Sequence, residues 1–224
     1  MTGLHLYLWT VIMNYATADD LINFELGIAK LWENGDLPFL LHFCGGNEAW
    51  LADFFQQVNE GDWIFSTHRN HYHALLGGID PNRLTDLIRR GDSMFVFDQQ
   101  RHFFTSSILA GTCGIAAGVA WALKEESSKN RVWCFLGDGA EEEGHFYEAV
   151  MMVTGHDLPC TFIIEDNNRS VDTSIEERMP NPFRMPWPDC VVRHSYTPVY
   201  PHAGNGCKHM ITFKPLAQTT ETAS

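Results

Sequence analysis

Two short apolar segments, separated by a stretch long enough for one helix, constrain the fold of this chain most. Residues 131–136 and 158–164 are rich in Val, Trp, Phe and Ile, and each is followed by a cluster of Gly, Asp or Asn. Such bounded apolar runs are typical of strands buried on both faces of a sheet. Residues 140–155 supply the helix between them, and this order requires a right-handed crossover. The sequence therefore predicts an α/β fold with a parallel sheet flanked by helices.

Composition narrows the class of protein. The chain has 224 residues, 45% of them hydrophobic, which predicts one globular domain with a sizeable core. A formal net charge of −13 disfavours binding to nucleic acid. No apolar run approaches the roughly 20 residues of a membrane span, and the first residues lack a secretory signature. We expect a cytoplasmic protein that does not bind a membrane.

The cysteines predict neither a disulfide framework nor a zinc site. They are widely spaced and no pair forms a CxxC motif. Isolated cysteines in apolar stretches usually behave as small buried hydrophobic residues, and we expect that here. The six are Cys44, Cys113, Cys134, Cys160, Cys190 and Cys207.

Helix boundaries can be read in the first half of the chain. Thr17 is the predicted N-cap of a helix that ends before Gly35, and a second helix is expected to begin near Asn47. Asp80 followed by Pro81 predicts the start of a third helix, which ends before Gly91.

Small residues dominate segment 110–123. We expect a helix there that approaches a neighbouring element closely, with Gly111, Gly114 and Gly118 as the contact points. The spacing is GxxGxxxG and not GxGxxG after a strand, so a nicotinamide cofactor receives little support.

The pattern changes after Arg178. Closely spaced prolines forbid a continuous helix or central strand there and predict a segment that straps over a surface. We expect a domain at residues 1–178, and a strap at 179–224 that belongs to the same domain, with a final strand near 190–196 and a frayed tail at 218–224. The prolines are Pro180, Pro182, Pro186 and Pro188.

Polar residues follow both buried strands where ligands of parallel sheets bind, beyond the carboxyl ends. Asp138 and Asn167 offer oxygen ligands for a hard cation, and Gly137 and Gly139 allow a diphosphate to approach the backbone. Mg²⁺ bridging a diphosphate is the predicted occupant. Each motif by itself is more often a tight turn, because Gly, Asp and Asn are common turn residues.

Together these motifs resemble a known family. Residues 137–149 and 158–174, with a Gly-Asp-Gly motif and an Asn 29 residues after its Asp, are similar to the diphosphate-binding domain of thiamine-diphosphate-dependent enzymes. The likeness is greatest to the alpha subunit of 2-oxo-acid dehydrogenases such as pyruvate dehydrogenase, and it extends to the related half of transketolase. It covers roughly residues 20–178, with further landmarks at Gly46–Ala49, His68–His71 and Ile108–Gly111.

The resemblance implies a set of cofactor contacts. Asp138 and Asn167 would bind Mg²⁺ through their side chains and Arg169 through its carbonyl, and diphosphate oxygens and water would complete the octahedron. Arg69 would pair with a phosphate, and Leu109 would meet the aminopyrimidine of thiamine diphosphate. The Gly-Asp-Gly loop would contact the diphosphate through Gly137, Asp138, Gly139 and Ala140.

Histidines are the candidate catalytic residues. His71 would lie near the diphosphate or the substrate, and His68 stands where the family usually has Tyr. A zinc site formed by His68, His71 and His73 is an alternative, and so are purely structural roles.

The chain departs from the family pattern at two places. Ser93-Met94-Phe95 stands where the family carries Ser-x-His, and His102 could compensate for the missing His. The fold is also expected to be shortened at its C-terminus, because the family domain normally continues beyond the point where this chain becomes proline-rich.

The implied function is that of an alpha-type subunit active in oxidative decarboxylation of a 2-oxo acid. Ketol transfer from a ketose substrate, simple decarboxylation and a non-catalytic role on the same fold remain alternatives. The glutamate that protonates the cofactor pyrimidine belongs in these families to a second domain, for which 224 residues leave no room. We therefore expect a beta-type partner subunit that supplies this Glu, in a hetero-tetramer.

Overall fold

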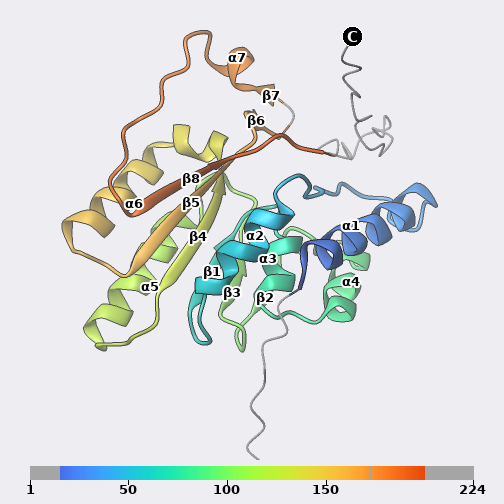
Figure 1. The fold of residues 1–224 in the computed structure, drawn as a ribbon, viewed down its shortest axis with the longest axis horizontal. Coiled ribbons are helices and arrows are strands. Elements are labelled where there is room, and N and C mark those ends of the chain that lie inside the picture. The colour runs from blue at the N-terminus through green and yellow to red at the C-terminus, as the bar shows by residue number, and fades with distance from the viewer. Residues whose placement is uncertain (1–15, 172, 200–224) are drawn as a thin grey trace, which may run out of the picture.

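A six-stranded sheet forms the centre of the protein. The computed structural model describes residues 16–171 and 173–199, and within them the strand order is β2-β3-β1-β4-β5-β8 (Figure 1). Only β2 runs antiparallel to its neighbour; the other adjacent pairs are parallel. The strands are β1 (Trp63–Ser66), β2 (Phe97–Asp98), β3 (Phe103–Thr105), β4 (Val132–Gly137), β5 (Cys160–Asp166) and β8 (Val191–Ser195). A separate two-stranded ribbon pairs β6 (Arg169–Ser170) with β7 (Thr173–Ser174).

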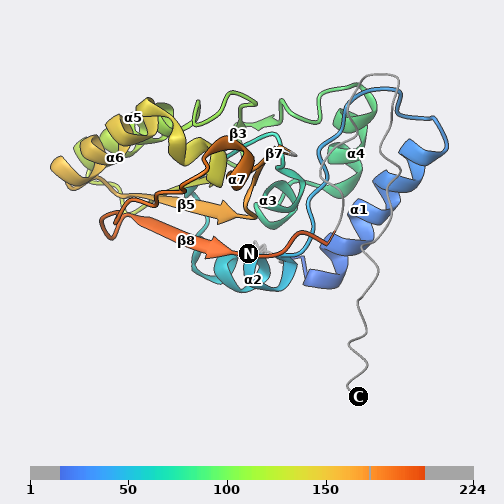
Figure 2. The same ribbon diagram turned by 90° about the horizontal axis from the view of Figure 1, so that it is seen from above.

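Helices cover both faces of the sheet. Helices α5 and α6 lie on one face, and α2 and α3 lie on the other, with α1 and α4 packed beyond α3 (Figures 1 and 2). The helices are α1 (Ala18–Glu33), α2 (Glu48–Phe54), α3 (His71–Leu76), α4 (Pro81–Arg89), α5 (Cys113–Glu125), α6 (Gly144–Gly155) and α7 (Ile175–Arg178). Two 3₁₀ turns are η1 (Phe55–Gln57) and η2 (Asp138–Glu142). The predicted α/β fold is confirmed.

Alternation along β4 explains its continuous apolar sequence. Cys134 and Leu136 pack into the cluster beneath α5 and α6, whereas Trp133 and Phe135 pack into the cluster beneath the N-terminal helices. Because successive side chains of a strand point to opposite faces, a strand covered on both faces must be apolar at every position. The prediction of two buried parallel strands is confirmed, and β4 pairs with β5 as expected.

The predicted helix caps are confirmed. Thr17 forms a capping box with Asp20, in which the Asp20 amide donates to the Thr17 hydroxyl. Asp80 accepts hydrogen bonds from the amides of Asn82 and Arg83 at the start of α4. These caps depend on neighbours in sequence, which is why sequence alone identified them.

Two local predictions are wrong in detail. Gly114 and Gly118 are exposed, and a Cβ built at either would meet nothing within 4 Å. The fully buried positions of α5 are instead Cys113, Ala116, Ala117 and Ala120, so small residues other than glycine permit the close approach to the sheet.

The helix expected over residues 140–155 begins only at Gly144. The preceding turn, η2, is held by the Glu141 carboxylate, which is buried and accepts hydrogen bonds from the side chains of Arg184, Trp187 and Arg193. Glu141 is therefore a buried residue that fastens the later strap and β8 to η2.

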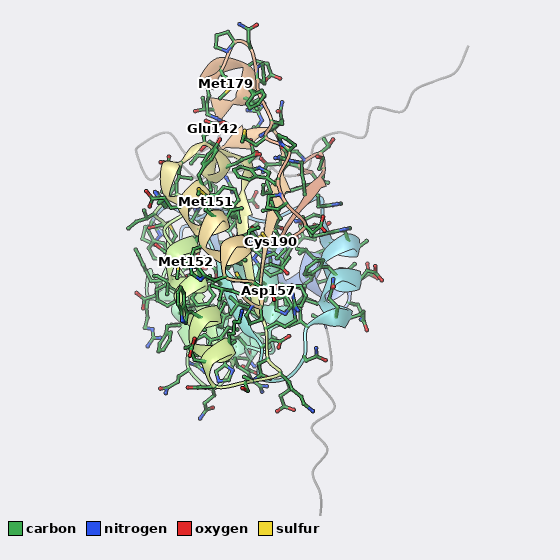
Figure 3. All side chains as sticks on the ribbon, turned by 90° about the vertical axis from the view of Figure 1, so that its left-hand side faces the viewer. Glu142, Met151, Met152, Asp157, Met179 and Cys190 are labelled. Carbon is green, nitrogen blue, oxygen red and sulfur yellow. The ribbon has the colours of Figure 1, made fainter. Side chains whose placement is uncertain are left out.

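The proline-rich segment behaves as a strap. Residues 179–190 contain no helix or strand, and they connect α7 to β8, which pairs with β5 as the predicted final strand. Figure 3 shows Met179 at the end of the molecule occupied by α7 and Cys190 nearer Asp157, so the strap runs back along the sheet. The boundary drawn at residue 178 stays a prediction, and segments 200–206 and 218–224 lie outside the described residues.

The cysteines are mostly buried, as the sequence predicts. Cys44, Cys113, Cys134 and Cys160 are free and buried as predicted, Cys190 is partly exposed, and Cys207 lies outside the described residues. In the described part of the chain, helices fall short of the length and apolarity that a membrane crossing requires.

Candidate active site

A pocket opens at the carboxyl ends of β1, β4 and β5, and it encloses about 680 Å³ including its open mouth. It collects residues from several loops that are distant in sequence, as the topology of a parallel sheet requires. Eight of the predicted site residues line it: His68, Arg69, Leu109, Gly137, Gly139, Ala140, Asn167 and Arg169. The structure thus brings together residues separated by as much as a hundred positions in the chain.

The loop after β4 and the loop after β5 are in close contact at one wall of the pocket. A Cβ built on Gly139 would lie 2.4 Å from the Ser170 hydroxyl oxygen, so only glycine fits there. A Cβ on Gly137 would meet nothing within 4 Å. One glycine therefore permits the contact between the loops, and the other leaves open space beside the backbone.

Asp138 lies below this wall and is fully buried. Its Oδ2 accepts a hydrogen bond of 2.9 Å from Nη2 of Arg178. No donor from the described part of the chain reaches Oδ1. Burial raises the pKa of the Asp138 carboxyl, an effect that the hydrogen bond from Arg178 opposes. A buried carboxylate oxygen without a donor is suited to a cation.

Asn167 and Arg169 share a local hydrogen bond. The Arg169 amide donates to Oδ1 of Asn167 at 3.0 Å, and Nδ2 of Asn167 donates to the Tyr196 hydroxyl at 3.4 Å. Burial raises the pKa of Tyr196, so this hydroxyl is neutral at physiological pH. Both the oxygen and the nitrogen of the Asn167 side chain are therefore held by hydrogen bonds, which fix its orientation.

Arg69 reaches across the pocket. Nη1 donates to the carbonyl of Phe43 and Nη2 to the carbonyl of Val171. The bond to Phe43 connects the loop after β1 to the segment before α2, and the bond to Val171 connects it to the loop after β5. Leu109 lines the same pocket, and its carbonyl accepts a hydrogen bond from Nε2 of His145.

His71 occupies a different environment from the one expected. Its ring is fully buried and does not line the pocket; Nδ1 lies 3.0 Å from Oε1 of Glu25, and Nε2 lies 2.8 Å from Oγ of Ser93. The structure separates it from His68, which does line the pocket. Its catalytic role stays a prediction, and its observed contacts are structural.

Sequence reasoning missed a second buried chain of polar groups at the pocket. Nε2 of His73 lies 3.1 Å from Oε2 of Glu165, and Nδ2 of Asn47 donates to Oε1 of the same carboxylate at 2.6 Å. The other ring nitrogen of His73 lies 2.7 Å from the Ser66 hydroxyl. Glu165 precedes Asn167 by two residues on β5, and this position at the end of the strand was the available signal.

The zinc alternative is wrong. His68, His71 and His73 turn toward different partners, and the described residues contain no group of three His, Cys, Asp or Glu able to hold a metal ion. His102 does not compensate for the missing family histidine either. It bonds to the Gly61 carbonyl and stacks on Trp63, at the opposite end of β1 from the pocket.

Sequence comparison identifies the class to which this fold and site belong. The pattern of a family described as the dehydrogenase E1 component matches residues 16–182. The chain belongs to this family.

Comparison with individual curated proteins finds similarity to alpha subunits of two kinds of enzyme. The chain is 30% identical over 184 residues to the alpha subunit of acetoin:2,6-dichlorophenolindophenol oxidoreductase from Bacillus subtilis, covering 78% of this chain and 55% of the relative. It is 32% identical over 162 residues to the pyruvate dehydrogenase E1 alpha subunit of Rickettsia felis, covering 68% and 50%. The Porphyra purpurea protein of the same name is 28% identical over 166 residues, covering 66% and 48%. The chain thus spans about half the length of these curated relatives.

Proposed function

We propose that this protein is an alpha-type subunit of a thiamine-diphosphate-dependent enzyme, and that it binds the cofactor diphosphate through Mg²⁺ for oxidative decarboxylation of a 2-oxo acid. The observation that carries the proposal is the buried, unpartnered Oδ1 of Asp138 beneath a pocket lined by Asn167 and Arg169. Mg²⁺ prefers oxygen ligands and is usually bound by one or two carboxylates together with substrate phosphates. The donor set therefore fits a magnesium diphosphate.

Different residues of the pocket are proposed to bind different parts of the cofactor. Asp138, Asn167 and the Arg169 carbonyl are the proposed metal ligands, and Arg69 is the proposed phosphate partner. Gly137, Gly139 and Ala140 provide backbone that a diphosphate can approach, because no side chain larger than a methyl group stands there. Leu109 contributes an apolar surface for the pyrimidine end of the cofactor.

The cofactor supplies the reactive carbon when it is bound, and the protein supplies orientation and electrostatics. His68 lies on the pocket wall and is the proposed group that exchanges a proton with the substrate. His71 supports the wall from behind through its bonds to Glu25 and Ser93. We propose that a beta-type partner provides the glutamate for the pyrimidine, in a hetero-tetramer.

A second candidate substrate class is a hydroxyketone. The Bacillus subtilis relative is named for acetoin, and the Glu165 carboxylate on the pocket wall is a hydrogen-bond acceptor suited to a hydroxyl group. A 2-oxo acid would instead bring its own negative charge toward Glu165. The two candidates share the cofactor site and differ only in the substrate.

Thermal unfolding tests the cofactor site. The full chain, with any partner that co-purifies, is heated with thiamine diphosphate and Mg²⁺, each alone and both together. Ligand at 100 times its dissociation constant stabilises the folded state by about 2.7 kcal/mol. We expect a shift only with both ligands, and its loss in Asp138→Ala. The exposed Asp53→Ala on α2 is the control and should keep the shift.

The outcomes separate the alternatives. No shift in the wild-type chain, with or without a partner, would support a non-catalytic role. A joint shift leads to turnover assays of the complex: acylation of a lipoyl carrier by a 2-oxo acid supports the leading reaction, and cleavage of acetoin supports the second candidate. Exchange between aldose and ketose would contradict both.

A further inference from the structure

We propose that Arg178 is a positioning residue for the cation site: it holds one oxygen of Asp138 and thereby leaves the other for a divalent cation. The inference rests on the proposed function and adds a residue that belongs to no part of the predicted site. It concerns how the metal ligand is held, and assigns no step of the reaction to Arg178.

Arg178 connects three segments of the chain. Nη2 donates to Oδ2 of Asp138 at 2.9 Å and to Oε1 of Glu142 at 2.9 Å. Nε also reaches the Glu142 carboxylate, at 3.2 and 3.3 Å from its two oxygens. Nη1 donates to the carbonyl of Thr173 at 2.8 Å. Every nitrogen of the guanidinium is thus engaged, and its position is fixed by several bonds at once.

The backbone that carries Arg178 is fixed too. It ends the short helix α7, whose first turn has a capping box between Ser174 and Glu177. Its side chain is 13% exposed. In Figure 3, Met179 at the end of α7 lies above Glu142 at the end of η2, which shows the two segments that the guanidinium joins. The β6–β7 ribbon leads directly from Asn167 and Arg169 to this helix.

The charge of Asp138 explains why an arginine is needed. A fully buried carboxylate is strongly disfavoured unless an opposite charge or hydrogen-bond donors replace its lost hydration. Arg178 is the only cation that forms an ion pair with Asp138 within the described residues. It balances the charge of the carboxylate, and its hydrogen bond to Oδ2 fixes the orientation of Oδ1.

The two oxygens of Asp138 have different surroundings. Arg178 bonds to Oδ2, and Oδ1 has no donor in the part of the chain that the structure describes. A cation can therefore bind Oδ1 while Arg178 keeps its place on Oδ2. Carboxylates that bind metals are commonly held in this way by an outer hydrogen-bonding partner, and removing such a partner typically costs 10- to 100-fold in metal affinity.

Binding of Mn²⁺, a paramagnetic substitute for Mg²⁺, tests the inference without relying on turnover. The full chain with any co-purifying partner is titrated with Mn²⁺ in the presence of thiamine diphosphate, and bound metal is followed by water proton relaxation. We expect Arg178→Met to bind Mn²⁺ about 10- to 100-fold more weakly than the wild type. Arg178→Lys keeps the charge but loses the planar fork, so its affinity should lie between the two.

Arg184→Met is the matched control. Arg184 also fastens the C-terminal segment to buried acids, Glu141 and Asp166, but it forms no ion pair with Asp138 among the described residues and acts on that carboxylate only at longer range. Its removal should leave Mn²⁺ affinity within about twofold of the wild type. Circular dichroism checks that each variant is folded, and if Arg178→Met does not fold, the reduced affinity of Arg178→Lys decides the test.

Other outcomes would overturn the inference. Unchanged affinity in Arg178→Met would show that Asp138 needs no outer partner, and tighter binding would show that Arg178 competes with the cation. Equal weakening in Arg184→Met would indicate a general effect of loosening the segment. Failure of the wild-type chain to bind Mn²⁺ would remove the proposed function itself, and the inference with it.

Discussion

Nδ1 of His71 lies 3.0 Å from Oε1 of Glu25, and both side chains are fully buried between α1 and α3. Glu25 also accepts a hydrogen bond from the backbone amide of Cys44, at the start of the pocket wall. The pair therefore joins the first helix of the domain to the segments that carry His68 and Arg69.

Removing one partner of this buried pair should destabilise the fold. Glu25→Ala leaves the His71 ring and the Cys44 amide without this acceptor, and a buried donor left unpaired costs about 1–3 kcal/mol. Urea unfolding of the wild type and of Glu25→Ala measures the difference between their free energies of unfolding. The control is Glu33→Ala at the exposed end of the same helix, for which we expect a change within about 0.5 kcal/mol. Similar losses in both variants would contradict a structural role for the pair.

The contact between the two cofactor loops should not tolerate a side chain at residue 139. Gly139→Ala places a Cβ 2.4 Å from the Ser170 hydroxyl oxygen, and relieving such overpacking costs about 1–3 kcal/mol. Thermal unfolding without ligands measures the loss. Gly137→Ala, which has open space around its Cβ, is the matched control and should unfold near the wild-type temperature. Adding Ser170→Gly to Gly139→Ala should restore stability, and no restoration would argue against this contact.

Stability should fall on mild acidification, and His194 should account for part of the change. This ring on β8 stacks on Trp50 with 4.0 Å between centroids, and partial burial lowers its pKa below the ordinary value of about 6.5. The unfolded chain therefore binds the proton more readily, so the folded state loses stability as the pH falls below about 6.5.

Urea midpoints measured between pH 8 and pH 5.5 test the role of His194. The His194→Gln variant lacks the titrating group, so its midpoint should decline less than that of the wild type over this range. An identical decline in the two chains would show that other groups produce the whole effect.

The cysteines should differ in reactivity. Burial raises the pKa of the Cys160 thiol, whereas Cys190 is partly exposed at the start of β8. Since the thiolate is the nucleophile, iodoacetamide should modify Cys190 before Cys160 in the folded protein. Peptide mass spectrometry after timed labelling reads the order directly, and urea should abolish the difference. Faster labelling of Cys160 in the native chain would contradict its observed burial.

Local patterns predicted much of the scaffold. Capping by Thr17 and Asp80 involves neighbours three residues away, so the signal was complete within a short window. Strands β4 and β5 were identified because double burial demands a continuous apolar run. The general rule for ligand sites of parallel sheets then placed the loops after these strands at one pocket.

Sequence patterns were least informative where a side chain has a partner far along the chain. Glu141 falls in the segment expected to be helical, but Arg184 and Arg193 pair with its buried carboxylate, and η2 forms there instead. His71 is the predicted catalytic residue, but the docking of α1 turns its ring toward Glu25, and it does not line the pocket. Periodicity gives no information about which of two helices meets a given side chain.

The sequence by itself determined the α/β class, the order of β4, α6 and β5 along the chain, and the meeting of the loops that follow these two strands. Each of these follows from local apolar runs, caps and the geometry of parallel strands. Only the tertiary structure decided that Arg178 reaches Asp138 across 40 residues and that Glu165 pairs with His73. Such contacts depend on how whole elements pack. A buried charge requires a partner of opposite charge or a hydrogen-bond donor, and only the completed fold determines which residue lies close enough to serve.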